Sequence, residues 1–305
     1  MKLVISGHTG FIGSHLVETM EGSEIVGISR NAKTDSRHEG INLDIGRPGK
    51  ASFNRASRAA RGAKAVVHLA AYRPMVRSER EDTLTENTTV NVLGTVNAMT
   101  MAIEAGVARF VLASSMAVYG GQPGVVGEGG PAVPLTNYGK SKLLAEGICE
   151  RYAKSYPISC IILRMSSVYG SGMPCNLVLA EFLNNALRDQ SLVVFRHLSG
   201  FERLDLVYVK DVVEAIKRAL ELDVARRFEV FNIAGRTSVS TLELARKVVD
   251  ETGSRSKIEV RKTQQRRVSM KLSINKAERQ LGWSPRYDIG AALRDLLPAW
   301  RCTKF

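Results

Sequence analysis

The chain has 305 residues, of which 44% are hydrophobic, and this is enough for a sizeable core in two domains or in one domain with a lobe. No apolar run approaches the ~18 residues that a membrane-spanning helix needs, and the opening MKLVISG lacks the features of a signal peptide. We therefore expect a cytoplasmic protein that does not contact membranes. The four cysteines form no C-x-x-C pair, so we expect neither a disulfide framework nor a metal site.

The formal net charge of +13 is compatible with a nucleic-acid partner, with anionic substrates such as nucleotides, or with an Arg-rich host proteome. The basic residues are scattered, and their densest run, residues 261–267, holds no aromatic side chain on which a base could stack. A solvated face or a loop that reaches a substrate phosphate fits this pattern better than a nucleic-acid surface.

Short apolar runs alternate with amphipathic stretches along much of the chain. We predict strands at residues 2–6, 24–28, 41–43, 65–69, 110–113, 159–163, 206–209 and 228–232, and helices at residues 11–21, 83–105, 137–155 and 211–222. This alternation predicts an α/β fold, a Rossmann doubly wound parallel sheet with helices on both faces. The less regular remainder predicts a smaller, discontinuous C-terminal substrate lobe. The expected division is residues 1–164 and 206–234 for the NAD(P)-binding domain, and residues 165–205 and 235–305 for the lobe.

The first predicted strand runs directly into a glycine-rich turn that opens a helix. Gly7 permits the tight turn, Gly10 lets the backbone approach a pyrophosphate, and Gly13 lets helix and strand pack closely. The helix N-terminus then offers free N–H groups and a partial positive charge to phosphates. This context predicts a dinucleotide site that also includes Thr9, Phe11 and Ile12.

Residues after the next two strands bear on the choice between NAD and NADP. An NAD site usually has an acidic residue after the second strand, and an NADP site has an arginine nearby. Ser29 and Arg30 occupy that place, so we predict an NAD(P) site with a mild preference for NADP. The alternative is that Arg30 is a solvated surface residue. Asp44 and Ile45 are expected beside the adenine.

Tyr138 and Lys142 form a Y-x-x-x-K pattern in a predicted helix, where positions i and i+4 share a face. A nearby ammonium favours the phenolate, so we expect Lys142 to lower the pKa of Tyr138 and make it a usable general acid/base. Ser115 ends a predicted strand. Because ligands bind beyond the carboxyl ends of parallel strands, we expect Ser115 to donate a hydrogen bond to a substrate oxygen.

Several motifs follow one another in an order typical of one family. They are GHTGFIG at 7–13, HLAA at 68–71, NVLGT at 91–95, SSMAVYG at 114–120, YGKSK at 138–142, VYG at 168–170, VYVKD at 207–211, FNIAG at 231–235 and KAERQLGW at 276–283. Through these motifs the sequence resembles the extended short-chain dehydrogenases/reductases, in the sugar epimerase/dehydratase branch that includes UDP-galactose 4-epimerase.

The resemblance implies a role for each matching residue. Tyr138 is the acid/base, Ser115 orients the substrate oxygen, Lys142 tunes Tyr138 and binds the nicotinamide ribose, and Asn91 supports the site. It also implies that the cofactor is lined by Leu69, Ala70 and Ala71. Relatives often pair through the two long helices beside the active site, so a homodimer is expected. The implied substrate is a nucleotide-linked sugar.

The sequence departs from the family pattern at three places. Dehydratases and decarboxylases generally carry an acidic residue just after the active-site Ser/Thr, whereas this chain has Met116 and Ala117, which disfavours elimination. Ser167 replaces a frequent Asn, and residues 204–206 lack the usual Arg, both at positions that commonly touch the nucleotide diphosphate. The candidate substrate contacts are therefore Arg73, Ser115, Ser167, Arg203 and Arg267. The alternative is that these arginines only solvate the surface.

Three functions stay open at this point. A sugar-nucleotide epimerase is the main hypothesis, and an NADPH-dependent ketoreductase of a 4-keto sugar or another carbonyl is the alternative. A non-catalytic Rossmann protein that binds RNA is a remote third. The presence of Ser115, Tyr138 and Lys142 together favours an enzyme.

Overall fold

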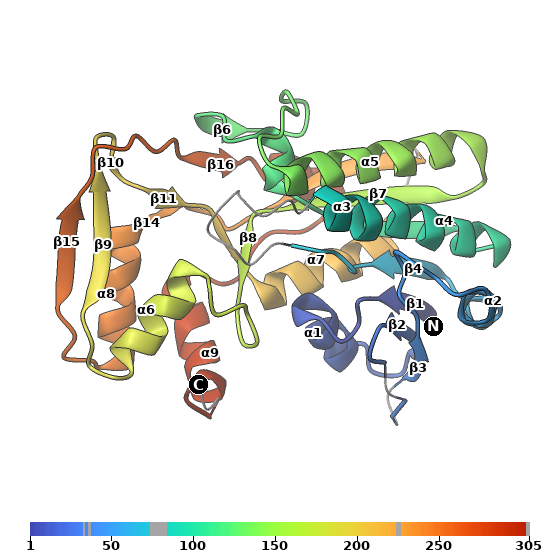
Figure 1. The fold of residues 1–305 in the computed structure, drawn as a ribbon, viewed down its shortest axis with the longest axis horizontal. Helices are drawn as coiled ribbons and strands as arrows, with labels where there is room; N and C mark the ends of the chain where they lie inside the picture. Colours follow the sequence, from blue (N-terminus) through green and yellow to red (C-terminus); the bar gives the residue numbers. More distant parts are fainter. Residues whose placement is uncertain (33, 36–37, 74–83, 224–226, 303–305) are drawn as a thin grey trace. The chain divides into compact units, whose positions relative to one another are not determined.

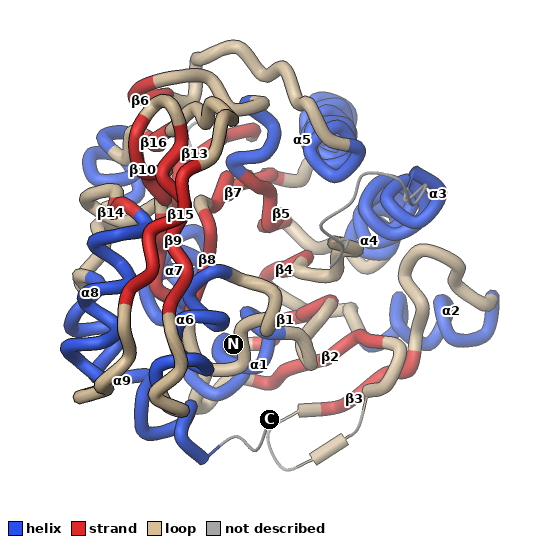
Figure 2. Tube along the Cα trace, turned by 60° about the vertical axis from the view of Figure 1, so that its left-hand side comes forward, coloured by secondary structure: helices blue, strands red, loops and turns tan. Residues whose placement is uncertain are grey.

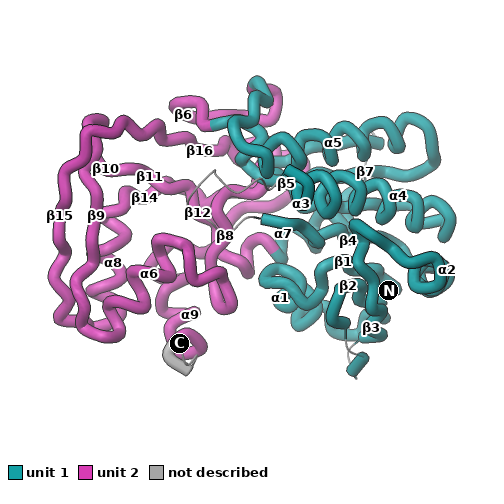
Figure 3. Tube along the Cα trace, viewed as in Figure 1, with its two compact units in different colours: residues 1–120, 131–164, 213–231 teal, residues 121–130, 165–212, 232–305 magenta. Residues whose placement is uncertain are grey.

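The computed structural model describes residues 1–32, 34–35, 38–73, 84–223 and 227–302. The chain divides into two compact units: residues 1–120, 131–164 and 213–231 form the first, and residues 121–130, 165–212 and 232–305 the second (Figure 3). Residues 121–130 join the second unit because β6 (Gly124–Val126) pairs with β16 (Met270–Leu272), a pairing that the expected division did not include. The role of the second unit as a substrate lobe stays a prediction.

A seven-stranded sheet forms the centre of the first unit (Figure 1). Its order is β13-β7-β5-β4-β1-β2-β3, and the pairs from β5 through β3 are parallel. The strands are β1 (Lys2–Ser6), β2 (Glu24–Ser29), β3 (Glu39–Asn42), β4 (Ala65–His68), β5 (Arg109–Ser115), β7 (Ser159–Met165) and β13 (Phe228–Ile233). The order reverses between β1 and β4, which is where doubly wound folds bind ligands. The predicted Rossmann fold is confirmed.

Helices cover both faces of this sheet. Figures 1 and 2 show α2 (Lys50–Ala59), α4 (Gly94–Glu104) and α5 (Asn137–Ser155) on one face. The other face carries α1 (Phe11–Thr19) and α7 (Val209–Glu221). The core under the first group consists of fully buried apolar side chains, among them Val4, Val66, Met99, Phe110, Leu112 and Ile162.

Two helical segments of the first unit differ from the prediction. Helix α2 was not predicted, because most of its residues are polar and it buries Ala56 alone, so it shows no apolar periodicity. The predicted helix 83–105 is α3 (Leu84–Glu86), a π-helical segment (Asn87–Leu93) and α4 in succession; residue 83 lies outside the described residues. A π-helical turn shifts the apolar period, so a search for period 3.6 does not reveal it.

The second unit is built of short strands and helices. Its elements are β6, β8 (Ser167–Tyr169), α6 (Val178–Ala186), β9 (Leu192–His197), β10 (Gly200–Phe201), β11 (Arg203–Leu204), β12 (Leu206–Tyr208), β14 (Val239–Ser240), α8 (Thr241–Thr252), β15 (Ile258–Lys262), β16, a π-helical turn (Ala277–Leu281) and α9 (Ile289–Cys302). Ser240 and Glu243 form a capping box that begins α8. None of the helices in the described ranges is long and apolar enough to cross a membrane.

Candidate active site

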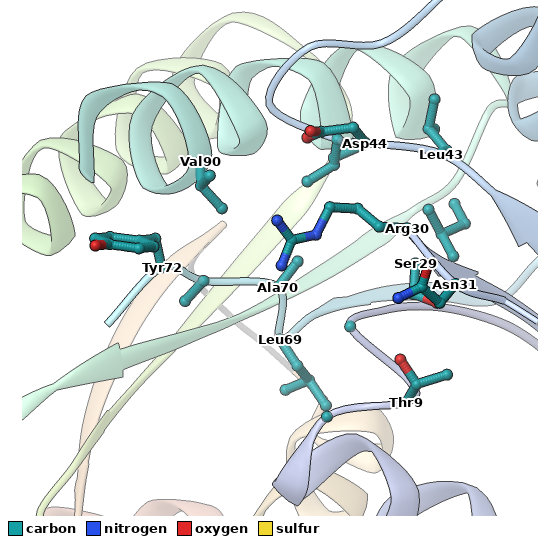
Figure 4. Close-up of a pocket in the computed structure, with 15 residues that line it drawn as sticks. Thr9, Ser29, Arg30, Asn31, Leu43, Asp44, Leu69, Ala70, Tyr72 and Val90 are labelled. Atoms are coloured by element: carbon teal, nitrogen blue, oxygen red, sulfur yellow. The ribbon is translucent and has the colours of Figure 1, made fainter. Parts of the chain in front are cut away.

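A cavity of about 250 Å³ lies at the reversal point of the sheet, between the glycine turn and the ends of β2, β3 and β4 (Figure 4). Ten of the predicted cofactor residues line it: Gly7, Thr9, Gly10, Ser29, Arg30, Asp44, Ile45, Leu69, Ala70 and Ala71. The other five predicted cofactor residues do not line it: Phe11, Ile12 and Gly13 open α1 beneath the turn, and Tyr138 and Lys142 lie on α5. Sequence analysis missed five further lining residues, which are Ile28, Asn31, Leu43, Tyr72 and Val90.

The glycine turn is shaped by close backbone contacts. Gly7 has a φ of +76°, and a Cβ at this position would lie 2.7 Å from the backbone nitrogen of Ala70. A Cβ at Gly13 would lie 2.2 Å from the carbonyl oxygen of Gly7. Among the described residues no side chain caps the N-terminus of α1, so the first N–H groups of this helix have no side-chain acceptor. A cradle of this kind fits the pyrophosphate of a dinucleotide.

Polar side chains on the opposite wall fit the rest of a dinucleotide. Arg30 points into the cavity, and Asp44 lies on the same side (Figure 4). The carboxylate of Asp44 accepts a hydrogen bond from the Gly46 backbone N–H at 3.0 Å, and Asn97 donates to the carbonyl oxygen of Ile45 at 2.8 Å. These bonds hold the loop after β3 in place beside the cavity.

The three predicted catalytic side chains come together at the end of β5. The hydroxyl of Tyr138 is hydrogen-bonded to the side chain of Ser115. The Lys142 ammonium lies 5.9 Å from the centre of the Tyr138 ring and donates to the carbonyl oxygen of Ala113 at 2.8 Å. Gly139 lets α5 approach this closely, because a Cβ there would lie 2.5 Å from the Ala117 carbonyl oxygen.

Burial controls the titration of this group. It raises the pKa of Tyr138, while Arg73 and the bond to Ser115 lower that pKa by less. The expectation that Lys142 lowers the pKa of Tyr138 was therefore wrong about the net direction and about the responsible cation. Burial also lowers the pKa of Lys142 to about 8, against the opposing effect of Glu146 and Cys149.

Asn91, one of the two buried residues of the π-helical segment, is predicted to support the site. Its side-chain oxygen accepts from the Tyr72 N–H at 2.7 Å, and its amide donates to the Tyr72 carbonyl at 2.9 Å. The same amide lies 2.9 Å from the Ser141 hydroxyl and 3.1 Å from the Asn87 side-chain oxygen. Asn91 thus ties the loop after β4 to α5, and π-helical turns recur at functional sites for such purposes.

The predicted substrate contacts are spread over both units. Arg73 lies in the first unit and acts electrostatically on Tyr138. Ser167 is exposed on β8. The Arg203 guanidinium donates to the Ser238 side chain at 3.0 Å and to its carbonyl at 2.6 Å, and the Arg267 N–H donates to the Ser199 hydroxyl at 3.1 Å. Substrate contacts by these residues stay predictions. Within the described residues no group of three or more His, Cys, Asp or Glu side chains could hold a metal ion.

The Rossmann sheet, the glycine cradle and the Ser-Tyr-Lys group define a short-chain dehydrogenase/reductase. The chain belongs to the NAD dependent epimerase/dehydratase family, whose model matches residues 3–234. It is 31% identical over 308 residues to a Methanocaldococcus jannaschii protein provisionally named UDP-glucose 4-epimerase, with 96% of each chain covered.

Two solved epimerase structures are similar to this chain over nearly its whole length. UDP-glucuronic acid 4-epimerase from Bacillus cereus in complex with NAD has a TM-score of 0.84 at 25% identity, with 99% of each chain covered. The Thermus thermophilus UDP-glucose 4-epimerase complex with NAD has a TM-score of 0.85 at 26% identity, with 100% of each chain covered. The family and the enzyme class predicted from the sequence, an NAD(P)-dependent epimerase-type oxidoreductase, are confirmed.

Proposed function

We propose that this enzyme is a UDP-sugar 4-epimerase that regenerates its bound dinucleotide in every turnover. The observation that carries the proposal is the Ser115, Tyr138 and Lys142 group, which is assembled in the same unit as the dinucleotide cavity. Support for the substrate class comes from the relatives, which are named for UDP-glucose and UDP-glucuronic acid.

Each side chain of the group has a defined task in this reaction. Tyr138 takes the proton from the C4 hydroxyl of the sugar and returns it to the C4 oxygen afterwards. Ser115 donates a hydrogen bond to that oxygen and orients it toward Tyr138. The positive charge of Arg73, which lowers the pKa of Tyr138, stabilises the phenolate while it exists, and Lys142 holds the nicotinamide ribose. When bound, the nicotinamide supplies a hydride acceptor that also returns the hydride.

Elimination is disfavoured by the residues after Ser115. Met116 and Ala117 open a short 3₁₀ turn (Met116–Tyr119), and neither can donate or accept a proton. The site therefore has an acid/base at Tyr138 but none at the place where dehydratases generally carry one. This favours epimerisation, in which the substrate keeps all its atoms, over loss of water or carbon dioxide.

Cofactor choice rests on Ser29 and Arg30 at the cavity wall. The two solved epimerases contain NAD. In this chain no acidic side chain follows β2, and Arg30 points into the cavity where a 2′-phosphate would bind (Figure 4). We therefore keep the prediction that this site accepts NADP, with a mild preference over NAD.

Exposed leucines on the helices beside the active site favour a homodimer. Leu84 is 51% exposed, Leu93 is 48% exposed and Leu144 on α5 is 59% exposed. Apolar side chains on two neighbouring long helices suit an isologous interface, in which the same helices of two copies pair. Leu144→Glu should then convert a dimer to a monomer in light scattering; a mass of one chain for the unsubstituted protein would refute the dimer. The cytoplasmic location also stays a prediction.

The test of function is turnover without added cofactor. The purified protein is first denatured to identify the dinucleotide that it carries, and the native protein is then given UDP-glucose or UDP-glucuronic acid. We expect the 4-epimer to form with no net change in the nicotinamide absorbance. Stoichiometric oxidation of NADPH with a keto sugar would instead identify a reductase. Salt-dependent RNA binding without any turnover would identify a binding protein.

A further inference from the structure

A buried ion pair lies directly behind the catalytic group. Glu146 on α5 and Arg164 near the end of β7 have side chains that are 4% and 8% exposed. Arg164 Nη2 lies 2.7 Å from Glu146 Oε2, and Arg164 Nε lies 3.0 Å from Oε1, so the contact is bidentate. Burying two charges costs desolvation energy, and the attraction between the charges often only balances this cost. Stability alone therefore does not explain why such a pair is present.

Both members of the pair continue to the chain segment that carries Ser115. The Ser114 hydroxyl donates to Glu146 Oε1. Arg164 Nη1 donates to the Tyr119 hydroxyl at 2.9 Å, and its guanidinium carbon lies 4.8 Å from the centre of the Tyr119 ring. Along the chain, Ser115 therefore lies between Ser114 and Tyr119, and both of these residues are hydrogen-bonded to the ion pair.

The same carboxylate also fixes α5. Glu146 follows Lys142 by four residues, so both side chains extend from one face of the helix. Lys142 donates to the Ala113 carbonyl on β5, and Glu146 accepts from Ser114, the next residue of that strand. Two consecutive residues of β5 are thus joined to two consecutive turns of the helix that carries Tyr138.

We propose that Glu146 is a positioning residue of the active site: through Ser114 directly, and through Arg164 and Tyr119, it holds Ser115 in place relative to Tyr138 and Lys142. Glu146 has no contact with the dinucleotide cavity. Its effect on turnover rests on the proposed function, since it acts by keeping the donor of Ser115 aligned with the acid/base. Misplacement of a reacting group by about 1 Å can cost roughly 100-fold in rate.

The carboxylate also acts on Lys142 through its charge. The titratable groups that face Lys142 are His68 from β4, and Tyr138, Glu146 and Cys149 from α5. His68 is neutral near pH 7 because burial lowers its pKa to about 3. Glu146 raises the pKa of Lys142 against the larger effect of burial. Removing the carboxylate should therefore let Lys142 lose its proton at a lower pH.

Two conservative variants test the positioning role, and the first has a matched control. Ser114→Ala removes one bond to Glu146, and its control is Ser159→Ala, which removes an exposed bond to the Ala108 carbonyl on the same sheet. Tyr119→Phe removes the bond from Arg164. We expect Ser114→Ala and Tyr119→Phe to lower kcat by roughly 10-fold or more, with KM for the UDP-sugar and the bound dinucleotide unchanged. Unchanged kcat in both variants, with only a lower melting temperature, would overturn the proposal.

A third variant gives a readout that needs no substrate. Glu146→Gln keeps the size of the side chain and removes its charge; the control is Glu150→Gln, one turn further along α5, where Glu150 pairs with exposed Lys154. The Lys142 titration is followed by NMR of lysine labelled at Cε and assigned with Lys142→Met. We expect a midpoint near 8 in the unsubstituted protein and a lower one in Glu146→Gln alone. Equal midpoints in both variants would overturn the effect of Glu146 on Lys142.

The two sets of measurements separate this inference from the proposed function. Where no UDP-sugar is turned over by the unsubstituted protein but the Lys142 midpoint moves in Glu146→Gln, the function is wrong and the link from Glu146 to the site stands. Where turnover occurs and kcat is unchanged in both Ser114→Ala and Tyr119→Phe, the function stands and the positioning role is wrong. If Glu146→Gln does not fold, Ser114→Ala and Tyr119→Phe decide.

Discussion

The dinucleotide cavity and the catalytic group lie in the same unit but are built by different means. The glycine turn that forms one wall of the cavity is shaped by backbone contacts, because Gly7 and, beneath the turn, Gly13 leave no room for a Cβ. The catalytic group depends on polar side chains, Ser115, Tyr138 and Lys142, and on a buried ion pair behind them. Substitutions that add bulk should therefore damage the cavity. Substitutions that remove a charge or a hydrogen bond should damage the catalytic group. Substitutions of each kind can separate the two.

Tyr138→Phe should have the largest effect. It removes the acid/base and keeps the ring, so we expect kcat to fall by roughly 10²–10⁴. Dinucleotide content should stay the same, because the cavity at the sheet reversal does not include Tyr138. Rate assays with the released dinucleotide measured in parallel check both points, and undiminished turnover would remove Tyr138 from the mechanism.

Gly13→Ala should damage the other region. The new Cβ would lie 2.2 Å from the Gly7 carbonyl oxygen, and overpacking of this kind costs about 1–3 kcal/mol of unfolding free energy. Dinucleotide affinity should fall with it, since the turn must move. Gly147→Ala on α5 is the control, because its Cβ meets nothing within 4 Å and a helical alanine should stabilise by about 0.5–1 kcal/mol. Similar denaturation curves for the two variants would contradict the steric account.

Arg30→Ala should have a smaller and more selective effect. A lost charge-assisted contact to a 2′-phosphate is worth about 1.5 kcal/mol at an exposed site, or roughly 10-fold in Kd. We expect NADP binding to weaken by that factor and NAD binding to stay nearly constant. Titration calorimetry with both dinucleotides measures this, and equal losses would mean that Arg30 does not select the cofactor.

A change of pH should act in opposite directions on activity and stability. Burial places the pKa of Lys142 near 8, below the ordinary lysine value of 10.5. Activity should fall as the pH rises past 8, because Lys142 loses the charge with which it holds the nicotinamide ribose. Between pH 8 and 10.5 the folded protein has lost the Lys142 proton, whereas the unfolded chain still binds it. The free energy of unfolding should therefore increase as the pH rises through that window. In Lys142→Arg, which stays charged, both changes should disappear from the pH profiles of rate and of chemical denaturation.

Local sequence signals predicted ten of the residues that line the cavity and brought together Ser115, Tyr138 and Lys142, whose catalytic role stays a prediction. The glycine turn is contiguous, and α5 begins and ends where its pattern predicts, at Asn137 and Ser155. Tyr72 and Val90 were missed as cavity residues because a loop and a π-helical segment bring them there. The Glu146–Arg164 pair was missed for a different reason: it depends on β7 lying beside β5, which sheet order decides and spacing along the chain does not.

The central claim is that the hydride taken from the sugar is returned to it within one turnover. The most direct measurement uses UDP-glucose deuterated at C4 with the enzyme as purified and no added cofactor. The account predicts that the 4-epimer forms, keeps its deuterium, and leaves no net reduced dinucleotide. Loss of deuterium to solvent, or dinucleotide reduced in proportion to the product, would contradict it.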